Sequence, residues 1–410
     1  MSYAGIEKMI MSIVKSGAAS KAGLYREVPS FYTDNLIAVE EHQAEKIGPR
    51  GVYPPAHEWL NAKIAEIWCD KPPQKTLNHK ALDQALQWIS ELRPAGSIDV
   101  DEGAIEEGFK TAGTDEQDMN SLNVDTNSCY PTYVRHWYHK VWDKSVTVAQ
   151  KMVQLLLVNE SRLLWRKALK AASWKDNILT FWATAHQRTN VANGHRATKD
   201  NTYRGVLMSK LRAVCAMPKL DTILGKPILN RLIASVKEIR NPDGTRMFVA
   251  LTTPELIDKT LDTCLVTAHN HGLAPLSTDF SGYDTTVPPW LAMKVAYAVS
   301  RWMTERCANI FLALIYSAFY NTGCITPTAV FEPGPSSMKS GSWMTNIMDS
   351  LINLTVQRYG LYAGHWSSIL NQFVQGDDAI LVGEGVTPES FEKNASELGF
   401  VANADKQYWD

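Results

Sequence analysis

The spacing of hydrophobic and polar residues divides the chain into parts of different character. Residues 1 to about 140 mix helical stretches, such as 81–93, with loops broken by proline and glycine. Over residues 141–188 apolar side chains recur at helical spacing, which predicts a helical region. After about residue 265, short apolar strands that end at acidic turns alternate with long helices. That alternation predicts an α/β layer in the last part.

The longest apolar stretch predicts a buried helix. It covers residues 307–320, is too short to cross a bilayer, and follows the charged pair Glu305 and Arg306. The N-terminal residues 1–17 contain Glu7 and lack the basic start, long apolar core and cleavage site of a signal peptide. We therefore expect neither export nor a membrane span.

Composition indicates an ordinary globular protein. The chain has 410 residues, of which 45% are hydrophobic and 20% charged, so two or three subdomains are expected. Its six cysteines are scattered without a zinc-binding spacing, which favours a reducing compartment.

Charge is distributed unevenly along the chain. The whole chain carries −2, but residues 161–246 hold 17 lysines and arginines against five acidic residues. This segment is therefore +12 and the remainder −14. A polyanion such as nucleic acid is a plausible partner for the segment, and a solvated basic face of a helical domain is the alternative.

Acidic residues follow two predicted strands. In FVQGDDAILVGE, residues 373–384, Asp377 and Asp378 sit at the tip of a predicted hairpin. Taken alone, this pattern is typical of a common turn. In LAPLSTDFSGYDTTVPPWLAMKV, residues 273–295, a strand runs into Asp279, Asp284 follows five residues later, and two prolines open a helix.

Carboxylates that converge from two strand ends repel one another unless cations lie between them. Oxygen ligands of this kind suit Mg²⁺ or Mn²⁺. Two such ions, roughly 3.5–4 Å apart, can clamp the attacking and leaving oxygens of a phosphoryl transfer. The two motifs together therefore predict a two-metal site.

A glycine-containing loop and a helix lie between these motifs, in GPSSMKSGSWMTNIMDSLINL, residues 334–354. Thr345, Asp349 and Asn353 fall at i, i+4 and i+8 on one face of the predicted helix. An ordinary amphipathic helix is the simplest interpretation. The polar stripe of one acid and two neutral hydrogen-bonding groups also suits a ribose and a base pair.

Taken in order, these motifs resemble a known family. Asp-x4-Asp, then Ser-Gly-x3-Thr-x3-Asp-Ser-x2-Asn, then Gly-Asp-Asp is similar to palm motifs A, B and C of viral RNA-dependent RNA polymerases. The residues of these motifs are most similar to those in polymerases of double-stranded RNA viruses of the picobirnavirus and partitivirus type. In these polymerases aspartate, rather than asparagine, stands at the position of Asp349.

Three further segments resemble motifs of the same family. KLRAVCAMP, residues 210–218, is similar to motif F, which implies that Lys210 and Arg212 hold the incoming triphosphate. LGFVANADKQ is similar to motif D, which implies that Lys406 protonates the pyrophosphate leaving group. TNSCYP, residues 126–131, is a faint match to the template-contacting motif G, with Cys129 where glycine is usual.

The resemblance implies an α+β fold of the right-hand polymerase type, with helix-rich fingers and an RRM-like antiparallel palm. The implied division is an N-terminal region with fingers at 1–140, fingers with motif F at 141–265, and a palm with motifs A to D at 266–410, which contains a finger insertion at about 303–333. Motif E and the thumb are expected next but do not follow, so we expect the thumb to be absent or truncated.

The resemblance also implies roles for single residues. Asp279 and Asp377 would ligate two Mg²⁺ or Mn²⁺ ions, with help from Asp378, and Lys406 would act as general acid. Asp284 would select ribose by accepting a hydrogen bond from the 2′-hydroxyl. The remaining nucleotide contacts implied are Lys210, Arg212, Ser340, Gly341, Thr345 and Asp349.

Two other functions stay open at this point. Reverse transcriptases usually carry an aromatic residue before Asp-Asp at the hairpin and an aromatic gate at the position of Asp284, so Gly376 and Asp284 disfavour them. A non-catalytic RNA-binding or capsid-associated protein would share the charge pattern. The expected partners are template RNA, nascent RNA, NTPs and a viral capsid protein, in the virion or the host cytoplasm.

Overall fold

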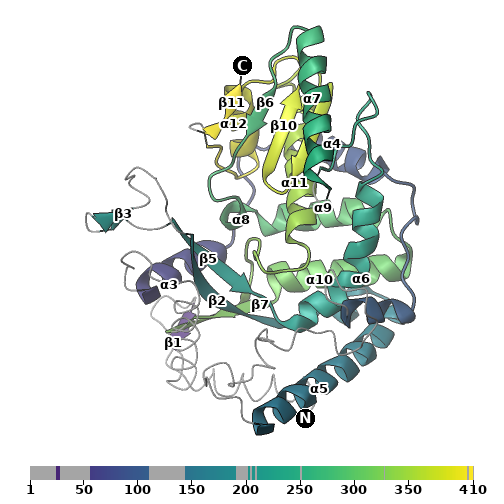
Figure 1. Cartoon of the computed structure of the whole chain (residues 1–410), viewed down its shortest axis with the longest axis vertical. Coiled ribbons are helices and arrows are strands. Elements are labelled where there is room, and N and C mark those ends of the chain that lie inside the picture. Colours follow the sequence, from purple (N-terminus) through teal and green to yellow (C-terminus); the bar gives the residue numbers. More distant parts are fainter. Residues whose placement is uncertain are drawn as a thin grey trace.

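A computed structural model describes residues 25–27, 56–109, 144–190, 202–203, 206–207, 210–249, 252–326, 328–403 and 406–409 (Figure 1). Its helices are α3 (Ala56–Ile67), α4 (His79–Glu91), η1 (Gly103–Phe109), α5 (Lys144–Leu169), η3 (Trp174–Asn177), α6 (Lys219–Val236), α7 (Pro254–Asn270), α8 (Tyr283–Thr286), α9 (Pro289–Ser300), α10 (Glu305–Tyr320), α11 (Thr345–Tyr362) and α12 (Pro388–Glu397). Its strands are β1 (Tyr25–Glu27), β2 (Phe181–Asn190), β3 (Thr202–Tyr203), β4 (Val206–Leu207), β5 (Lys210–Ala216), β6 (Leu276–Thr278), β7 (Thr322–Ile325), β8 (Ala329–Gly334), β9 (Asn371–Gln375), β10 (Asp378–Val382) and β11 (Tyr408–Trp409).

The last part of the chain forms a four-stranded sheet in the order β11-β6-β10-β9, at the top of Figure 1. All of its pairings are antiparallel. Helix α11 contacts β9, and α12 contacts β6. Strand residues such as Leu276, Val374 and Leu381 are completely buried. The fold class is therefore α+β, as predicted, and this sheet is not the parallel sheet of an α/β layer.

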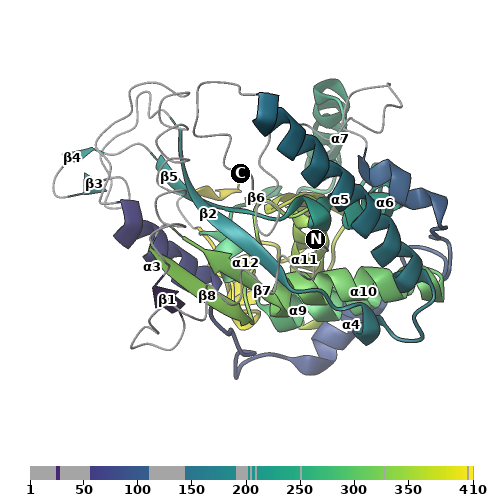
Figure 2. The same ribbon diagram turned by 90° about the horizontal axis from the view of Figure 1, so that it is seen from below.

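A second sheet joins distant stretches of sequence in the order β1-β8-β7-β2-β5. Strand β2 pairs parallel with β7 and antiparallel with β5. In the view from below, β2 and β7 lie beside α10 (Figure 2). Strands β7 and β8, from residues 322–334, therefore join the basic segment and not the four-stranded sheet. The predicted division into three regions stays a prediction.

The helical region predicted over residues 141–188 is partly wrong. Helix α5 ends at Leu169, and residues 181–190 form strand β2. Residues 181–185 are buried without alternation, so both faces of β2 are covered over this stretch. Phe181, Trp182 and Thr184 favour strands, and pairing with two neighbours decides the outcome.

The predicted buried helix over residues 307–320 is confirmed as α10. Phe311, Ile315 and Phe319 on this helix are fully buried, and α10 packs against α9. Helix α9 contacts both α4 and α11, so a layer of helices supports the four-stranded sheet. Within the described ranges no helix has the length and apolar character needed to cross a membrane.

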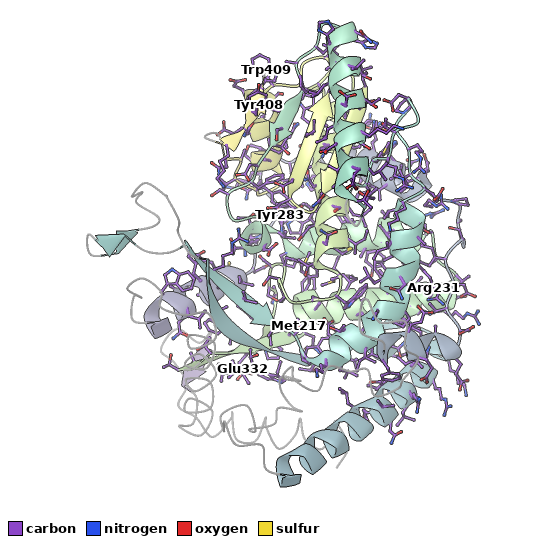
Figure 3. All side chains as sticks on the ribbon, viewed as in Figure 1. Met217, Arg231, Tyr283, Glu332, Tyr408 and Trp409 are labelled. Carbon is purple, nitrogen blue, oxygen red and sulfur yellow. The ribbon has the colours of Figure 1, made fainter. Side chains whose placement is uncertain are left out.

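An aromatic cluster anchors the segment between β6 and α8. The ring of Phe280 lies 4.8 Å from that of Tyr283 and 5.5 Å from that of Phe400, between centroids. Tyr283 also stacks on Phe400 at 5.2 Å. Figure 3 shows Tyr283 at the junction between the four-stranded sheet and the lower part of the molecule. The acidic residues on either side of this cluster are thereby held on a rigid base.

Candidate active site

Strand register brings two of the predicted aspartates together. Ala379 of β10 pairs with Thr278 of β6. Asp378 begins β10 and Asp279 directly follows β6, so the two residues stand opposite each other, one step beyond that pair. Opposed Cα atoms of antiparallel strands lie about 4.5–5.5 Å apart. Asp377 precedes Asp378 in the turn from β9, as the sequence predicted.

Side chains of helix α11 hold the turn at Gly376 and Asp377 in place. The Asn353 side chain donates to the carbonyl oxygens of Gly376 at 3.2 Å and Asp377 at 2.8 Å. The Gly376 N–H donates to the Ser350 hydroxyl at 2.8 Å. Gly376 has φ of +64°, a conformation that favours glycine. Asn353, which falls on the polar stripe that also suits a nucleotide, is buried and supports the turn at Gly376 and Asp377.

Asp279 has two polar partners from the end of the chain. Asn403 Nδ2 donates to Asp279 Oδ2 at 2.7 Å, and Lys406 Nζ lies 3.5 Å from the same oxygen. The backbone N–H of Asn403 also donates to the Asp279 carbonyl at 2.9 Å. Sequence reasoning missed Asn403, although it stands three residues before Lys406. The predicted general acid thus lies beside the predicted metal ligand.

The electrostatics of the strand ends are repulsive. Burial and the charges of Asp377 and Asp279 raise the pKa of Asp378, and Lys406 opposes this shift. Among the described residues, no three His, Cys, Asp or Glu side chains form a ready-made metal site. Asp279, Asp377 and Asp378 therefore lie near one another and offer only oxygen ligands, which suit Mg²⁺ or Mn²⁺. Their carboxyl groups do not converge on one point.

Asp284 and Asp349 form a second acidic pair, which the charge of Asp377 also affects. Desolvation and the charge of Asp377 raise the pKa of Asp284 to about 6, opposed by a hydrogen bond from Asp349 and the charge of Arg212. Asp349 is buried, and desolvation with the charges of Asp284 and Asp377 raises its pKa well above the usual range. Of the two carboxyl groups, Asp349 is therefore the more fully buried, and the shift of its pKa favours the form that donates a hydrogen bond to Asp284.

Basic and loop residues approach this acidic pair from the other sheet. Arg212 on β5 is exposed, and its charge acts on Asp284. Lys210 begins the same strand, but its side chain lies outside the described part. Ser340 and Gly341 are exposed in the loop before α11. The Thr345 hydroxyl donates to the Lys339 carbonyl at 2.8 Å, so it caps this loop.

Comparison with known proteins identifies the family. Residues 260–408 match the family model described as viral RNA-dependent RNA polymerase. This match covers both strand ends, the loop and helix α11. Residues 260–408 belong to the viral RNA-dependent RNA polymerase family.

Two solved structures resemble the polymerase over its whole length. Both are RNA-dependent RNA polymerases of a human picobirnavirus, one of them an insertion-loop deletion mutant. Each is 17% identical to the polymerase and covers 100% of it. The deletion mutant gives a TM-score of 0.55 over 69% of its own chain, and the other structure gives 0.58 over 67%. No curated protein matches the polymerase.

The family match and the fold agree with the predicted activity. The predicted viral RNA-dependent RNA polymerase is confirmed by the family match, and the fold resembles that of picobirnavirus polymerases. Neither the reverse transcriptase nor the non-catalytic RNA-binding protein is favoured. The polymerase is thus an RNA-directed nucleotidyltransferase. The motif G candidate at residues 126–131 lies outside the described residues.

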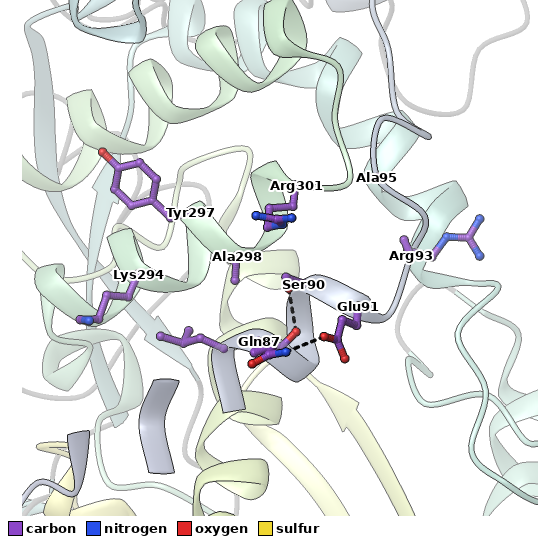
Figure 4. Close-up of a pocket in the computed structure, with 10 residues that line it drawn as sticks. Gln87, Ser90, Glu91, Arg93, Ala95, Lys294, Tyr297, Ala298 and Arg301 are labelled. Atoms are coloured by element: carbon purple, nitrogen blue, oxygen red, sulfur yellow. Dashed lines mark hydrogen bonds between the residues drawn. The ribbon is translucent and has the colours of Figure 1, made fainter. Parts of the chain in front are cut away.

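A cavity elsewhere on the polymerase is not part of this site. It measures about 760 Å³ and is lined by residues of α4, α9 and the turns after them, including Arg93, Tyr297 and Arg301 (Figure 4). Arg301 caps the C-terminus of α9, and Arg93 directly follows the cap of α4. Cations at helix C-termini offset the helix dipole, which accounts for them here. None of the predicted catalytic aspartates lines this cavity.

Proposed function

We propose that this polymerase extends an RNA 3′ end with NTPs, using Asp279 and Asp377 as metal ligands and Asp378 as an assisting carboxylate. The observation that carries the proposal is the register of β6 and β10, which sets Asp279 opposite Asp378 beside the Asp377 turn. Two Mg²⁺ or Mn²⁺ ions, when bound, would lower the pKa of the 3′-hydroxyl and neutralise the pyrophosphate.

The proposed layout is that of a right-handed polymerase. Residues 141–265 are the fingers that carry motif F, and residues 266–410 form the palm around the antiparallel sheet. Strands β7 and β8, which pair within the other sheet, support a finger insertion at about residues 303–333. In this layout template RNA and nascent RNA lie between the two sheets.

The residues around the aspartates have complementary tasks. Lys210 and Arg212 on β5 neutralise the triphosphate as negative charge moves onto the leaving group. Lys406 donates the proton that the leaving pyrophosphate requires. Its position beside Asp279, 3.5 Å from Oδ2, keeps this cation next to the reacting phosphate and moderates the repulsion among the carboxylates.

Ribose selection is assigned to the second acidic pair. The Asp349 proton is directed at Asp284, which leaves Asp284 as an acceptor for the 2′-hydroxyl, with Ser340, Gly341 and Thr345 shaping the pocket wall. A deoxynucleotide leaves that acceptor unpaired. The cost of an unpaired acceptor is about 1–3 kcal/mol, or roughly ten- to a hundred-fold in discrimination.

The test is RNA synthesis with matched measurements of RNA binding. Extension of a primed RNA template in Mg²⁺ should fall at least about a hundred-fold in Asp279→Ala and Asp377→Ala, because metal ligands are lost. Binding of the same RNA should change little. Extension that survives in both variants would refute the assignment. Equal RNA binding without extension in any protein, wild type included, would favour the non-catalytic alternative.

A further inference from the structure

The loop that leads into α11 is packed tightly onto β5. A side-chain carbon added at Gly341 would lie 2.4 Å from the Cys215 carbonyl oxygen, so only glycine allows this approach. The Cys215 N–H donates to the Ser340 hydroxyl at 3.4 Å. Cys215 lies three residues after Arg212 on the same strand. The position of the loop and that of the strand with the triphosphate-binding arginine are therefore linked.

One buried carboxylate fastens the middle of this loop. The Ser342 hydroxyl donates to Asp221 Oδ2 at 2.8 Å. Asp221 belongs to the first turn of α6 and is fully buried. Its other oxygen, Oδ1, is also buried, and hydrogen bonds from Trp343 of the same loop act on this carboxyl group as well. Burying a carboxyl group is costly unless it is hydrogen-bonded, and the bonds that Asp221 accepts come from the loop and not from its own helix.

Two more contacts clamp the same loop. The Trp343 ring covers Gly225 of α6 so closely that a side-chain carbon there would lie 2.2 Å from it. Lys339 is buried at the start of the loop, where its Nζ donates to the Ser336 hydroxyl at 2.5 Å and lies 5.3 Å from the Trp68 ring centre. These contacts hold the two sides of the loop, and Asp221 holds its centre.

The clamped loop is connected to the proposed ribose selector at both ends. The Met338 N–H, just before the loop, donates to the Asp284 carbonyl at 3.0 Å. At the other end, Thr345 caps the loop and begins α11, which carries Asp349 one turn later. A displaced loop would therefore shift both members of the acidic pair.

We infer that Asp221 is a positioning residue for nucleotide selection: through Ser342 it holds the 339–344 loop against β5 and thereby sets the Asp284–Asp349 pair. The residue touches no nucleotide and acts only through the loop. This inference rests on the proposed function for its effect on catalysis, but its structural step can be measured without catalysis.

The structural step is tested by hydrogen exchange of the full chain, followed for the amides of residues 340–344. Asp221→Ala and Ser342→Ala should speed exchange of these amides about tenfold, since a hydrogen bond to a carboxyl group is lost. Asp221→Asn keeps an acceptor for Ser342 and should exchange like the wild type. Peptides of β9 and β10 should not change in any variant.

Ser161→Ala is the matched control, because it removes another buried hydroxyl whose described bond, to the Leu157 carbonyl, stays within its own helix. Wild-type exchange in Asp221→Ala or Ser342→Ala would overturn the inference. So would exchange in Asp221→Asn as fast as in Asp221→Ala. Ser342→Ala decides the question if Asp221→Ala does not fold.

The catalytic step is tested by nucleotide kinetics. In Asp221→Ala the KM for NTP should rise about tenfold while kcat changes less, and the preference for NTP over dNTP should fall, with Asp221→Asn restoring both. Wild-type KM and sugar preference in Asp221→Ala, with a loosened loop, would overturn the link to nucleotide selection. A wild-type protein inactive in extension contradicts the proposed function, and hydrogen exchange still decides whether Asp221 anchors the loop.

Discussion

The strand-end site and the 339–344 loop are held in place by different kinds of contact. Asp279 and Asp378 are placed by backbone pairing between β6 and β10, which does not depend on their side chains. The loop is placed by side chains, through Ser342, Asp221 and the Trp343 ring on Gly225. Mutual repulsion at the strand ends is therefore tolerated by a rigid frame, whereas the loop depends on a small number of buried contacts.

This difference separates the expected effects of substitution. Replacing a strand-end aspartate should remove chemistry and leave the fold, because the frame is made by the main chain. Replacing a loop contact should change geometry first and chemistry through it. The turn at Gly376 and Asp377 shares both features, since its backbone accepts hydrogen bonds from the Asn353 side chain.

The largest effect should come from removing the Asn353 side chain, which holds the turn at Gly376 and Asp377. Asn353→Ala leaves the buried carbonyl of Gly376 and the partly buried carbonyl of Asp377 without this donor, at a cost of about 1–3 kcal/mol in the free energy of unfolding. RNA synthesis should fall with it, because Asp377 loses its support. Urea unfolding and primer extension measure the two effects. Thr355→Ala is the control, since its buried hydroxyl bonds to Leu351 within α11. Wild-type stability and activity in Asn353→Ala would contradict the prediction.

Overpacking the loop contact should come next. Gly225→Ala places a methyl group within 2.2 Å of the Trp343 ring and should cost about 1–3 kcal/mol of unfolding free energy, because the ring must move. Exchange of the loop amides should rise with it. Gly103→Ala is the matched control, because its nearest neighbour would stand at an ordinary 3.5 Å. Equal unfolding curves for the two variants would show that the Trp343 contact is not tight.

A pH-dependent effect should distinguish the buried carboxyl group from the strand-end carboxylates. Burial raises the pKa of Asp221 to about 7, with hydrogen bonds from Ser342 and Trp343 opposing the shift. Between about pH 3.9, the pKa of an unfolded aspartate, and about pH 7, the folded protein binds a proton that the unfolded chain does not, so stability falls as pH rises.

Asp221→Asn cannot titrate at this position. The difference in unfolding free energy between Asp221→Asn and the wild type should therefore increase, in favour of the variant, from about pH 4 to pH 7 and stay constant above that. Burial lowers the pKa of nearby Lys339 to about 7, which favours the folded state as pH rises further. The charge of Asp221 raises the pKa of Lys339, so in Asp221→Asn the Lys339 contribution begins at a lower pH and adds to the difference. Urea unfolding at a series of pH values measures the difference, and a gap that does not widen would refute the buried ionisation.

The smallest effect should follow an isosteric change in the acidic pair. Burial and the charges of Asp284 and Asp377 raise the pKa of Asp349, which favours its protonated form, and Asp349→Asn keeps a donor to Asp284 in the amide. We expect kcat/KM within about threefold of the wild type, less than about 1 kcal/mol, with ribose preference retained. Asp349→Leu should lose about tenfold in preference for NTP over dNTP. Similar preference in both variants would exclude Asp349 from sugar selection.

The strand ends were predictable from sequence because short-range patterns encode them. Apolar runs that stop at Asp279 and at the Gly376–Asp377 turn mark the ends of β6 and β9, and the prolines before residue 290 mark the start of α9. The pairing of strands was harder to predict from the sequence. The sequence predicts a helix where β2 lies, because the strands that pair with β2 are not local. Strands β5 and β7 lie about 25 and 140 residues away along the chain, and a local pattern does not contain them.

The supports of the site were not predictable. Asn353 falls on a polar stripe that fits a nucleotide equally well, and only its hydrogen bonds show that its partner is the turn at Gly376 and Asp377. Asn403 lies within the motif D match, but no local pattern indicates that its side chain bonds to Asp279. Asp221 looks like an ordinary acidic residue in the first turn of a helix, and its partner Ser342 is 121 residues away.

The sequence by itself determined which reactive groups the polymerase carries and where its strands stop, because turn chemistry and hydrophobic period act over a few residues. The tertiary structure alone decided which of those groups meet, which carboxyl groups keep their protons, and which loop is clamped. Those outcomes depend on burial and on contacts between elements far apart in the chain, and no local pattern records them.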